Sequence, residues 1–207
     1  MPRKPKRNTK GKIISAAWRL FYEQGYEDTT IEDILEASET SKGTFYHYFE
    51  GKDALLGTLS VLFDEKYEQL IPTIREDDNA LDVLAYLNRE LFAMIDSSVS
   101  LDLLARLLST QLTTRGEKHL LDRNRVYFRL LRDVIARGQS RGELRTDLSV
   151  NEIMKAYALM ERGLMYDWCL CSGEYSLSRY SADVMRMFLQ TYAAQSNKGP
   201  LSECTSE

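Results

Sequence analysis

The residues best suited to bind another molecule form one short run near position 45. From Lys42 to Phe49 the chain reads KGTFYHYF. An ammonium group, a glycine and a hydroxyl residue come directly before a run of five aromatic side chains, counting His47. Ammonium and hydroxyl groups hydrogen-bond to phosphate oxygens, and small residues let a helix backbone approach base edges in the DNA major groove. The alternative is a buried aromatic cluster. Because five adjacent residues cannot all face one side of a helix, part of the run must be exposed, which favours a contact surface.

The spacing within this run assigns each side chain to a face. Phe45 and Phe49 lie four residues apart, so both are expected to be buried on one side of a short helix. The opposite side would then present Gly43, Thr44, Tyr46 and His47. We expect Thr44 to touch a thymine methyl group or a phosphate, and the hydroxyls of Tyr46 and Tyr48 to reach phosphates on either flank.

Further phosphate contacts are expected at the ends of the neighbouring helices. Lys52 opens the next helix, so its ammonium group and the free N–H groups of that helix end can face a phosphate. Thr29 and Thr30 stand at the start of the preceding helix and are expected to act in the same way.

Helical periodicity predicts three helices that position these side chains. The first spans 9–24, with apolar residues at helical spacing from Ile13 to Phe21, and Gly25 is expected to end it. The second spans 31–38 and begins with a capping box at Thr30–Asp33. The third spans 41–49 after a tight turn, so this region has the pattern of a helix-turn-helix.

The rest of the chain is also expected to be helical, which gives an all-α protein of about nine helices. Apolar periodicity places the remaining helices at 52–71, 80–97, 101–114, 117–141, 150–172 and 177–195. We expect a helix-turn-helix domain with a basic arm at 1–51, a helical bundle at 52–195 and a disordered polar tail at 196–207.

The charge of the chain is unevenly distributed. The formal net charge is −4, yet residues 1–12 hold six basic side chains and no acidic one: Arg3, Lys4, Lys6, Arg7, Lys10 and Lys12. A basic arm beside an acidic body is typical of a DNA-binding protein with a separate regulatory body, although a basic tail can also serve solubility alone.

The sequence offers little to support catalysis or metal binding. Its two histidines, His47 and His119, are too few for most zinc sites, and Cys169 and Cys171 point about 200° apart around a helix. No P-loop, GxGxxG, GxSxG or HExxH motif occurs. We therefore expect no catalytic residue, metal or cofactor, and no enzyme activity, while a redox role for one cysteine stays open.

Nothing in the sequence points to a membrane or to secretion. No apolar segment is long enough to span a bilayer, and Met1 to Lys12 lack the apolar core of a signal peptide. Three cysteines without a CxxC motif fit a reducing compartment, so we expect a cytoplasmic protein.

Together these features resemble a known family. The segments TTIEDI at 29–34 and SKGTFYHYF at 41–49, followed by Lys52 and Leu55-Leu56, are similar to the signature of the tetracycline-repressor (TetR) family of bacterial transcriptional regulators. The resemblance covers about residues 9–56; beyond them the chain resembles the family only in length and helical periodicity. In that family, DNA contacts come from the positions of Thr30, Lys42, Gly43, Thr44, Tyr46, His47, Tyr48 and Lys52.

The resemblance implies a homodimeric regulator with a small-molecule pocket in its C-terminal domain. The family's common mode is repression from a near-palindromic operator in double-stranded DNA, relieved when a ligand binds. Two positions depart from the pattern. The turn between the two reading helices usually carries glycine, whereas Ser38–Thr40 supplies none, so Glu39 is expected in a slightly different turn. Glu50 stands where a basic residue is frequent and weakens the attraction to phosphate.

The last two helices are expected to form the dimer interface. Helix 150–172 is apolar on almost every side, so it must be buried against several neighbours, one of them a partner subunit. The alternative is a central core helix in a monomer. The predicted interface residues are Tyr157, Leu164, Tyr180, Val184, Met187, Phe188 and Thr191.

A pocket for the small molecule is expected within the same bundle. Aromatic and methionine side chains are adaptable lining material, although each could equally be plain core. The candidates are Phe92, Arg106, Tyr127, Phe128, Met160 and Trp168.

Two other functions stay open at this stage. One is a helix-turn-helix protein that binds DNA without a ligand, in an architectural role. The other is a helical enzyme or carrier that keeps a vestigial helix-turn-helix. A change of DNA affinity caused by a small molecule separates the ligand-responsive regulator from the ligand-independent protein. A gel-shift with genomic DNA fragments separates both of these from the enzyme or carrier.

Deleting residues 1–8 is expected to weaken DNA binding and to make it less dependent on salt. The four basic side chains lost would no longer release counterions, so the slope of log K against log salt should become shallower. A salt titration of both forms on one DNA fragment measures this slope. An unchanged slope would refute a role for the arm in DNA binding.

Overall fold

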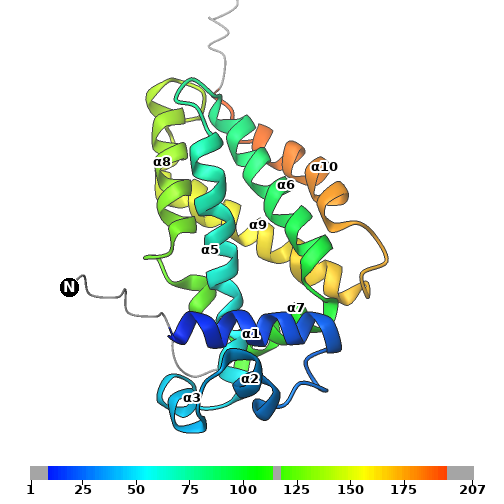
Figure 1. Cartoon of the computed structure of the whole chain (residues 1–207). Coiled ribbons are helices and arrows are strands. Elements are labelled where there is room, and N and C mark those ends of the chain that lie inside the picture. The colour runs from blue at the N-terminus through cyan, green and yellow to red at the C-terminus, as the bar shows by residue number, and fades with distance from the viewer. Residues whose placement is uncertain (1–8, 114–117, 195–207) are drawn as a thin grey trace, which may run out of the picture.

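The protein is helical throughout the part that the computed structural model describes, residues 9–113 and 118–194, as the sequence predicts (Figure 1). The helices of residues 9–48 gather at one end of the molecule, and most of the remaining helices form a bundle above them. We call these two parts the head, residues 9–51, and the body, residues 52–194. The predictions for the basic arm before residue 9 and for the tail after residue 194 lie outside the described residues.

The head contains the three predicted helices α1 (Thr9–Gln24), α2 (Ile31–Ser38) and α3 (Lys42–Tyr48). Gly25 follows α1 with φ of +89°, a conformation that favours glycine. At the start of α2 the Thr30 hydroxyl accepts the Asp33 N–H at 3.1 Å, and the Asp33 carboxylate accepts the Thr30 N–H at 2.8 Å. These hydrogen bonds lower the pKa of Asp33, as a carboxylate that accepts N–H donors requires. Gly25 and the capping box are therefore confirmed.

The turn between α2 and α3 keeps a left-handed residue even though it has no glycine. Glu39 takes φ of 52° and ψ of 44°, and its N–H and that of Thr40 bond to carbonyls in the last turn of α2. The prediction of a different turn at Glu39 is wrong. Hydrogen bonds at the helix end and the Ser38–Thr40 hydroxyl contact of 2.7 Å hold the turn at the cost of about 1 kcal/mol of backbone strain.

The single helix predicted over 52–71 is two helices, α4 (Lys52–Leu56) and α5 (Leu59–Leu70), followed by the 3₁₀ helix η1 (Ile71–Thr73). The break falls at Gly57 and Thr58. The Thr58 hydroxyl donates to the Leu55 carbonyl at 2.6 Å and accepts the Trp18 indole N–H at 2.8 Å. The buried side chain of Trp18 therefore ties α1 to this break, and the described residues hold ten α-helices rather than nine.

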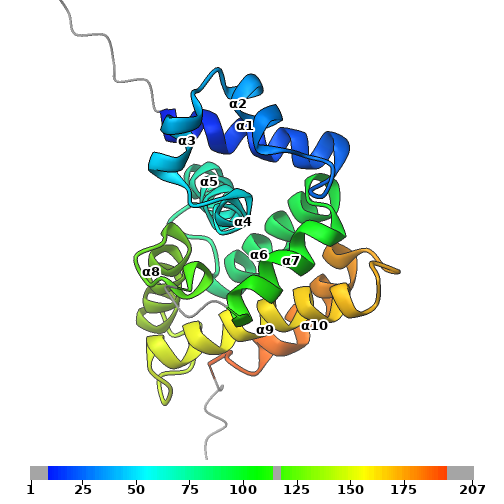
Figure 2. The same ribbon diagram turned by 90° about the horizontal axis from the view of Figure 1, so that it is seen from below.

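The body adds α6 (Ala80–Ser98), α7 (Leu101–Thr113), the 3₁₀ helix η2 (His119–Leu121), α8 (Val126–Ser140), α9 (Val150–Leu170) and α10 (Leu177–Gln190). Helix α10 packs along α6, and α9 packs against α7, α8 and α10 (Figure 2). The helix predicted over 117–141 begins later, at Val126. Before it, Arg125 reaches across to α5, where its guanidinium binds the Asp64 carboxylate at 2.9 Å and the Ser60 carbonyl at 3.0 Å.

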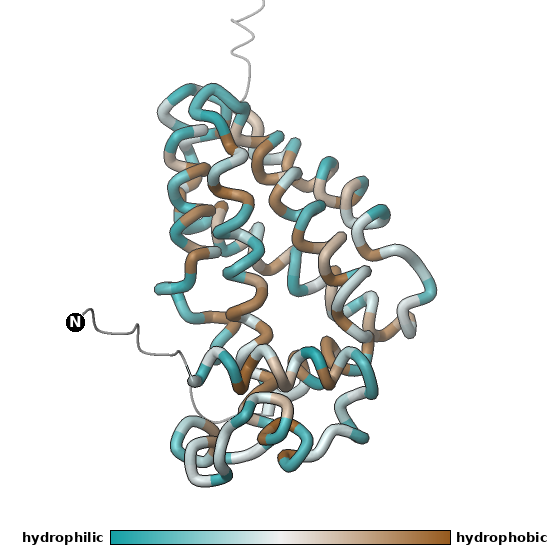
Figure 3. The backbone as a smooth tube through the Cα atoms, in the orientation of Figure 1, coloured by the Kyte–Doolittle hydropathy of each residue, from teal (hydrophilic) through white to brown (hydrophobic). Residues whose placement is uncertain are grey.

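One hydrophobic core runs through both parts of the molecule. It joins Phe21, Ile34 and Phe45 of the head to Leu55 and Leu59 at the start of the body, and continues through α6, α8 and α9. The hydropathy colouring shows apolar and polar residues alternating along these helices (Figure 3). Because the core is continuous across residue 51, a domain boundary at that point stays a prediction.

Replacing Glu39 by glycine is expected to stabilise the protein by roughly 0.5–1 kcal/mol. Glycine has no Cβ to clash in the left-handed region, and this gain exceeds its extra freedom in the unfolded chain. Urea unfolding of the two proteins measures the difference. Glu39→Gln is the matched control, since it removes the same charge but keeps the strain. Equal free energies of unfolding for the two variants would contradict this account.

Candidate functional site

Helix α3 presents a polar and aromatic surface to solvent. Phe45 and Phe49 are 0% and 5% exposed, as predicted, and pack into the core of the head. On the other side Tyr46 is 47% and Tyr48 40% exposed, and Lys42, Gly43 and His47 are also exposed. Thr44 is half-buried. The predicted arrangement of buried and exposed faces is therefore confirmed.

Local contacts fix the exposed side chains of α3 in place. The Ser41 hydroxyl caps the helix by accepting the Thr44 N–H at 3.2 Å, and it lies 2.8 Å from the Thr44 hydroxyl. The His47 and Tyr48 rings meet edge to face with centroids 4.8 Å apart. A Cβ added at Gly43 would meet no atom within 4 Å, so the fold itself does not require glycine there. The glycine leaves a bare backbone on the outer side of the helix.

The charges on this surface are accessible. Thr30 and Lys42 are exposed, and the Lys42 ammonium lies 3.4 Å from the Glu32 carboxylate, with both side chains more than half exposed. Such a surface ion pair contributes about 0–1 kcal/mol, so an anion can displace Glu32 at little cost.

Two predicted phosphate contacts are not available in the structure. Thr29 is completely buried, and its hydroxyl donates to the Gly25 carbonyl at 2.7 Å. The Lys52 ammonium donates to the carbonyls of Tyr26 at 2.7 Å and Thr29 at 2.9 Å, with Glu27 at 3.3 Å, and stands over the Tyr26 ring at 4.3 Å. Both assignments are therefore wrong. These side chains hold the loop between α1 and α2, because the carbonyls that follow α1 have no helical partner.

The same loop joins the head to the body. Tyr26 is buried; its hydroxyl hydrogen-bonds to the Asp53 carboxylate, and burial with this contact raises its pKa. The Arg106 guanidinium of α7 pairs with Glu27 and lies 5.1 Å from the Tyr26 ring centroid, while Asp102 holds it at 2.8 Å. Arg106 was predicted to line a ligand pocket. That prediction is wrong, since its charge is used at the head–body junction.

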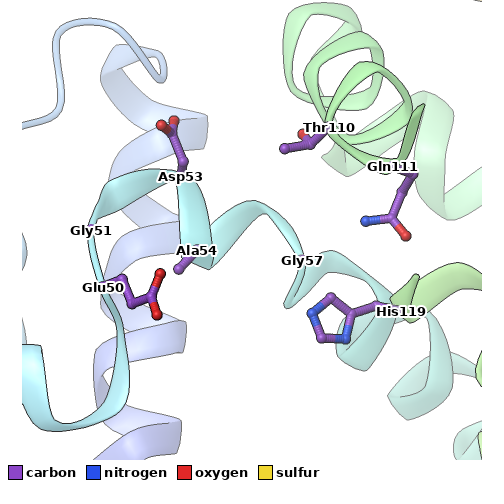
Figure 4. Close-up of a pocket in the computed structure, with 8 residues that line it drawn as sticks. All are labelled: Glu50, Gly51, Asp53, Ala54, Gly57, Thr110, Gln111 and His119. Atoms are coloured by element: carbon purple, nitrogen blue, oxygen red, sulfur yellow. The ribbon is translucent and has the colours of Figure 1, made fainter. Parts of the chain in front are cut away.

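A cavity of about 610 Å³ lies where the end of the head, at Glu50 and Gly51, meets the body. We call the break between α4 and α5, at Gly57 and Thr58, the hinge of the head. Figure 4 shows Asp53, Ala54 and Gly57 on one side of the cavity and Thr110, Gln111 and His119 on the other. A Cβ on Gly57 would lie 2.7 Å from the His119 ring, so the absence of a side chain lets η2 approach α4. The segment that carries His119 therefore contacts the hinge of the head directly.

The remaining pocket candidates lie mostly in the core of the body. Phe92, Tyr127, Phe128 and Trp168 are buried and Met160 is half-buried. The Trp168 indole N–H donates to the Tyr175 carbonyl at 2.8 Å. Tyr127 differs from the others because it lines a small cavity, and its hydroxyl donates to the Glu161 carboxyl group at 2.6 Å. Few of the predicted pocket residues therefore line a pocket together.

A groove that the sequence did not point to lies between α7, η2 and α9. Its volume is about 560 Å³, and its lining is mostly apolar. The apolar residues are Leu108, Leu112, Leu120, Leu121 and Tyr166, joined by Gln111, Lys118, Arg162 and Gly163. Leu112 is 75% exposed, which is unusual for leucine on a helix. Only the packing of η2 against the two helices creates this groove, so no local spacing could have predicted it.

The predicted dimer residues divide into two groups. Tyr157 and Leu164 are buried within the subunit, and the Tyr157 hydroxyl donates to the Leu84 carbonyl at 2.8 Å. Assigning these two residues to an interface is wrong, because they face the core. Tyr180, Met187 and Thr191 are exposed, and Val184 and Phe188 are half-buried. On α9 the exposed apolar residues are instead Leu159, Tyr166 and Leu170.

The described residues offer no group of three or more His, Cys, Asp or Glu side chains placed to hold a metal ion. Burial raises the pKa of the Cys169 thiol to about 11, which disfavours the thiolate that redox chemistry needs. Among the described helices, none combines the length and apolarity of a membrane span.

Replacing Lys52 by methionine is expected to lower the free energy of unfolding by about 1–3 kcal/mol. Methionine keeps the apolar contact with Tyr26 but removes the charged hydrogen bonds to the loop carbonyls. Thermal and urea unfolding measure the loss. Lys42→Met is the matched control and should change stability by less than about 0.5 kcal/mol. A Lys52→Met protein as stable as this control would show that the loop does not depend on the hydrogen bonds of the Lys52 ammonium group.

Known proteins resemble this chain most closely in the head. The sequence model for "Bacterial regulatory proteins, tetR family" matches residues 13–59. An uncharacterized HTH-type transcriptional regulator in the lacX 3' region of Lactococcus lactis subsp. lactis is 52% identical over 46 residues, which are 22% of this chain and 24% of that protein. The chain spans about a quarter of the length of the curated relatives that are more than 50% identical to it.

Similarity over the whole length is weaker but extends through the body. The fatty acid metabolism regulator protein of Bacillus subtilis (strain 168) is 24% identical over 190 residues, covering 90% of this chain and 96% of that protein. The crystal structure of Thermus thermophilus FadR in complex with lauroyl-CoA has a TM-score of 0.68 at 22% identity, covering 93% of this chain and 98% of the other. The fold is therefore an N-terminal helix-turn-helix followed by a helical bundle, and residues 13–59 are similar to the tetR family of bacterial regulatory proteins.

Proposed function

We propose that this protein is a homodimeric, sequence-specific DNA-binding regulator, acting in the cytoplasm as a repressor that a small molecule releases from a near-palindromic operator. The observation that carries the proposal is the exposed face of α3. Tyr46 and Tyr48 are large aromatic residues left in water beside an accessible lysine and a glycine that the fold does not need. Solvent-exposed aromatic rings of this kind are typical of contact surfaces.

The geometry of this face suits a major groove. Gly43 and Thr44 lie at the start of α3, where small side chains let the helix backbone reach base edges. Lys42, Tyr46, His47 and Tyr48 surround them with donors for phosphate oxygens, and the exposed start of α2 at Thr30 offers another. Thr44 is assigned a role in sequence preference and the others a role in affinity.

Dimerisation is proposed through the exposed apolar face of α9 and α10. Leu159, Leu170 and Met187 are 65%, 66% and 67% exposed, which leaves their apolar surface in water in a single subunit. Leu159, Tyr166 and Leu170 recur at helical spacing, so they lie on one side of α9. Gly163 lies between them with no atom near its missing side chain, which allows a partner helix to approach closely. A two-fold pair of this kind presents two copies of α3.

We propose that ligand binding changes DNA affinity by moving η2. Leu120 and Leu121 of η2 line the groove, and the neighbouring His119 packs against Gly57 of the head hinge. The relative from Thermus thermophilus was crystallised with lauroyl-CoA, which supports an apolar effector for this fold. A ligand that favours a displaced η2 would shift the spacing of the two α3 helices and so lower DNA affinity.

Selection of bound fragments from a random DNA pool should recover a near-palindrome whose half-site centres are roughly 34 Å apart, one helical turn. On that operator Tyr46→Ala should weaken binding on every sequence, whereas Thr44→Ala should change the preferred base. Recovery of no common sequence would overturn the proposal and favour an architectural role.

The salt dependence of DNA binding tests the two lysines. Lys42→Met should reduce the slope of log K against log salt by about one, and Lys52→Met should leave it unchanged.

Replacing Leu170 by glutamate is expected to convert the dimer to a monomer. A buried unpaired carboxylate costs several kcal/mol at an interface, whereas in a single subunit this position is exposed and the fold is kept. Sedimentation velocity with circular dichroism checks both points. Tyr22→Glu, at an equally exposed aromatic residue on α1, is the control and should remain dimeric. A dimer that persists in Leu170→Glu would place the interface elsewhere.

A further inference from the structure

A polar cluster is buried in the centre of the body, between α5, α6, α8 and α9. Glu161 is 2% exposed, and its carboxyl group accepts hydrogen bonds from the Tyr127 hydroxyl at 2.6 Å and the Asn88 amide at 3.0 Å. Burial raises the pKa of Glu161, and the Tyr127 hydrogen bond partly offsets this. An acid buried in an apolar core lowers the stability of the fold, so its presence indicates a function.

Two buried polar atoms beside this acid have no hydrogen-bond partner among the described residues. They are the Tyr67 hydroxyl and the Asn88 amide oxygen, and both residues are almost completely buried. An unpaired buried polar group costs about 1–3 kcal/mol, and such groups are few in folded proteins. The cluster therefore has an unused donor and an unused acceptor next to a carboxyl group.

Tyr67 and Glu161 face a small cavity that adjoins the apolar groove. The cavity has a volume of about 30 Å³, which matches the volume of one water molecule or one polar head group. Leu120 and Arg162 line both the cavity and the groove of about 560 Å³, so these two side chains lie where the two spaces adjoin. We call the cavity the socket; displacement of the Leu120 side chain would widen its connection to the groove.

The charges around the socket favour a ligand that donates hydrogen bonds. Arg125 also lines the cavity, but its guanidinium is bound to the Asp64 carboxylate and the Ser60 carbonyl, so its charge is already neutralised. Arg162 is half-buried at the boundary with the groove. A hydroxyl or ammonium head can donate to the Glu161 carboxyl group while its oxygen or a neighbouring water accepts from Tyr67. A carboxylate head would instead meet the carboxyl group of Glu161.

We propose that the effector is an amphiphile with an apolar tail and a hydrogen-bond-donating head, an alcohol or an amine, whose tail fills the groove and whose head lies in the socket against Tyr67, Tyr127 and Glu161. This inference rests on the proposed ligand response and names its chemical class. Entry of the head displaces Leu120, and with it η2, which carries His119 at the hinge of the head.

Calorimetric titration of the full-length protein with 1-octanol, octylamine and octanoate at neutral pH tests the class of ligand. The alcohol and the amine should bind about tenfold or more tightly than the carboxylate, as expected when a buried polar group is paired rather than opposed. Octanoate binding as tightly as 1-octanol, or no binding of any of the three, would overturn the proposal. Because the titration contains no DNA, its result is independent of whether the protein binds an operator.

Three variants test the socket itself. Tyr67→Phe removes only the unpartnered hydroxyl, so it should fold normally, and it should weaken 1-octanol binding about tenfold. Glu161→Gln should weaken octylamine more than 1-octanol, because it removes the carboxylate that pairs with an ammonium group. Tyr22→Phe removes the hydroxyl of an exposed tyrosine that lines neither the cavity nor the groove, so it is the control and should leave 1-octanol binding unchanged. Native affinity for 1-octanol in Tyr67→Phe would show that the head does not enter the socket.

A gel-shift experiment separates this inference from the function proposed above. Adding 1-octanol should reduce operator binding by the native protein but not by Tyr67→Phe. Tight 1-octanol binding with no effect on the operator complex would support the socket and refute the ligand response.

Discussion

The surface proposed to read DNA depends on the burial of two rings, those of Phe45 and Phe49. Helix α3 has only seven residues and could not persist alone in water, so its position relies on these anchors and on the Ser41 cap. Their burial decides which side of the helix faces outward. Tyr46 and His47 are exposed because Phe45 is not, and burying two phenylalanine side chains contributes roughly 3–6 kcal/mol to holding that orientation.

The head is attached to the body by contacts of two kinds. An apolar core continues from α1 through Leu55 and Leu59, which makes the attachment firm. Around it lie contacts that can be exchanged: the Arg106–Glu27 pair at the loop of the head, and the packing of His119 against Gly57 at the hinge. The proposed ligand response needs both a rigid link that transmits movement and a junction whose alternative arrangements differ little in energy.

Helix α9 meets three different requirements, two of them on the buried side that Tyr157, Glu161 and Leu164 share. Tyr157 and Leu164 complete the core, Glu161 supplies a buried acid, and Leu159 and Leu170 leave an apolar face in water. This explains why the helix is apolar almost all round without being a membrane span. Its core-facing side supplies stability, while the acid and the bare face each cost stability in the isolated subunit. Costs of this kind are expected where a helix also serves a ligand and a partner.

Local sequence determined the head almost completely. Helix bounds, the capping box at Thr30, the positive φ of Gly25 and the buried side of α3 all depend on residues within one or two helical turns, so spacing was sufficient to predict them. Spacing also showed that helix 150–172 is apolar on almost every side, without indicating that the side with Leu159, Tyr166 and Leu170 is the one left in water.

Tertiary structure decided everything that depends on contacts distant in the chain. The Lys52 ammonium is held by carbonyls more than twenty residues away, and Arg106 meets the loop of the head rather than a pocket. The break at Gly57, the groove beside η2 and the joining of Tyr67 to Glu161 likewise require α1, α5, α7 and α9 to be packed together. Residue type and periodicity show that a charged or aromatic side chain is present, but only the packed fold determines which partner neutralises it.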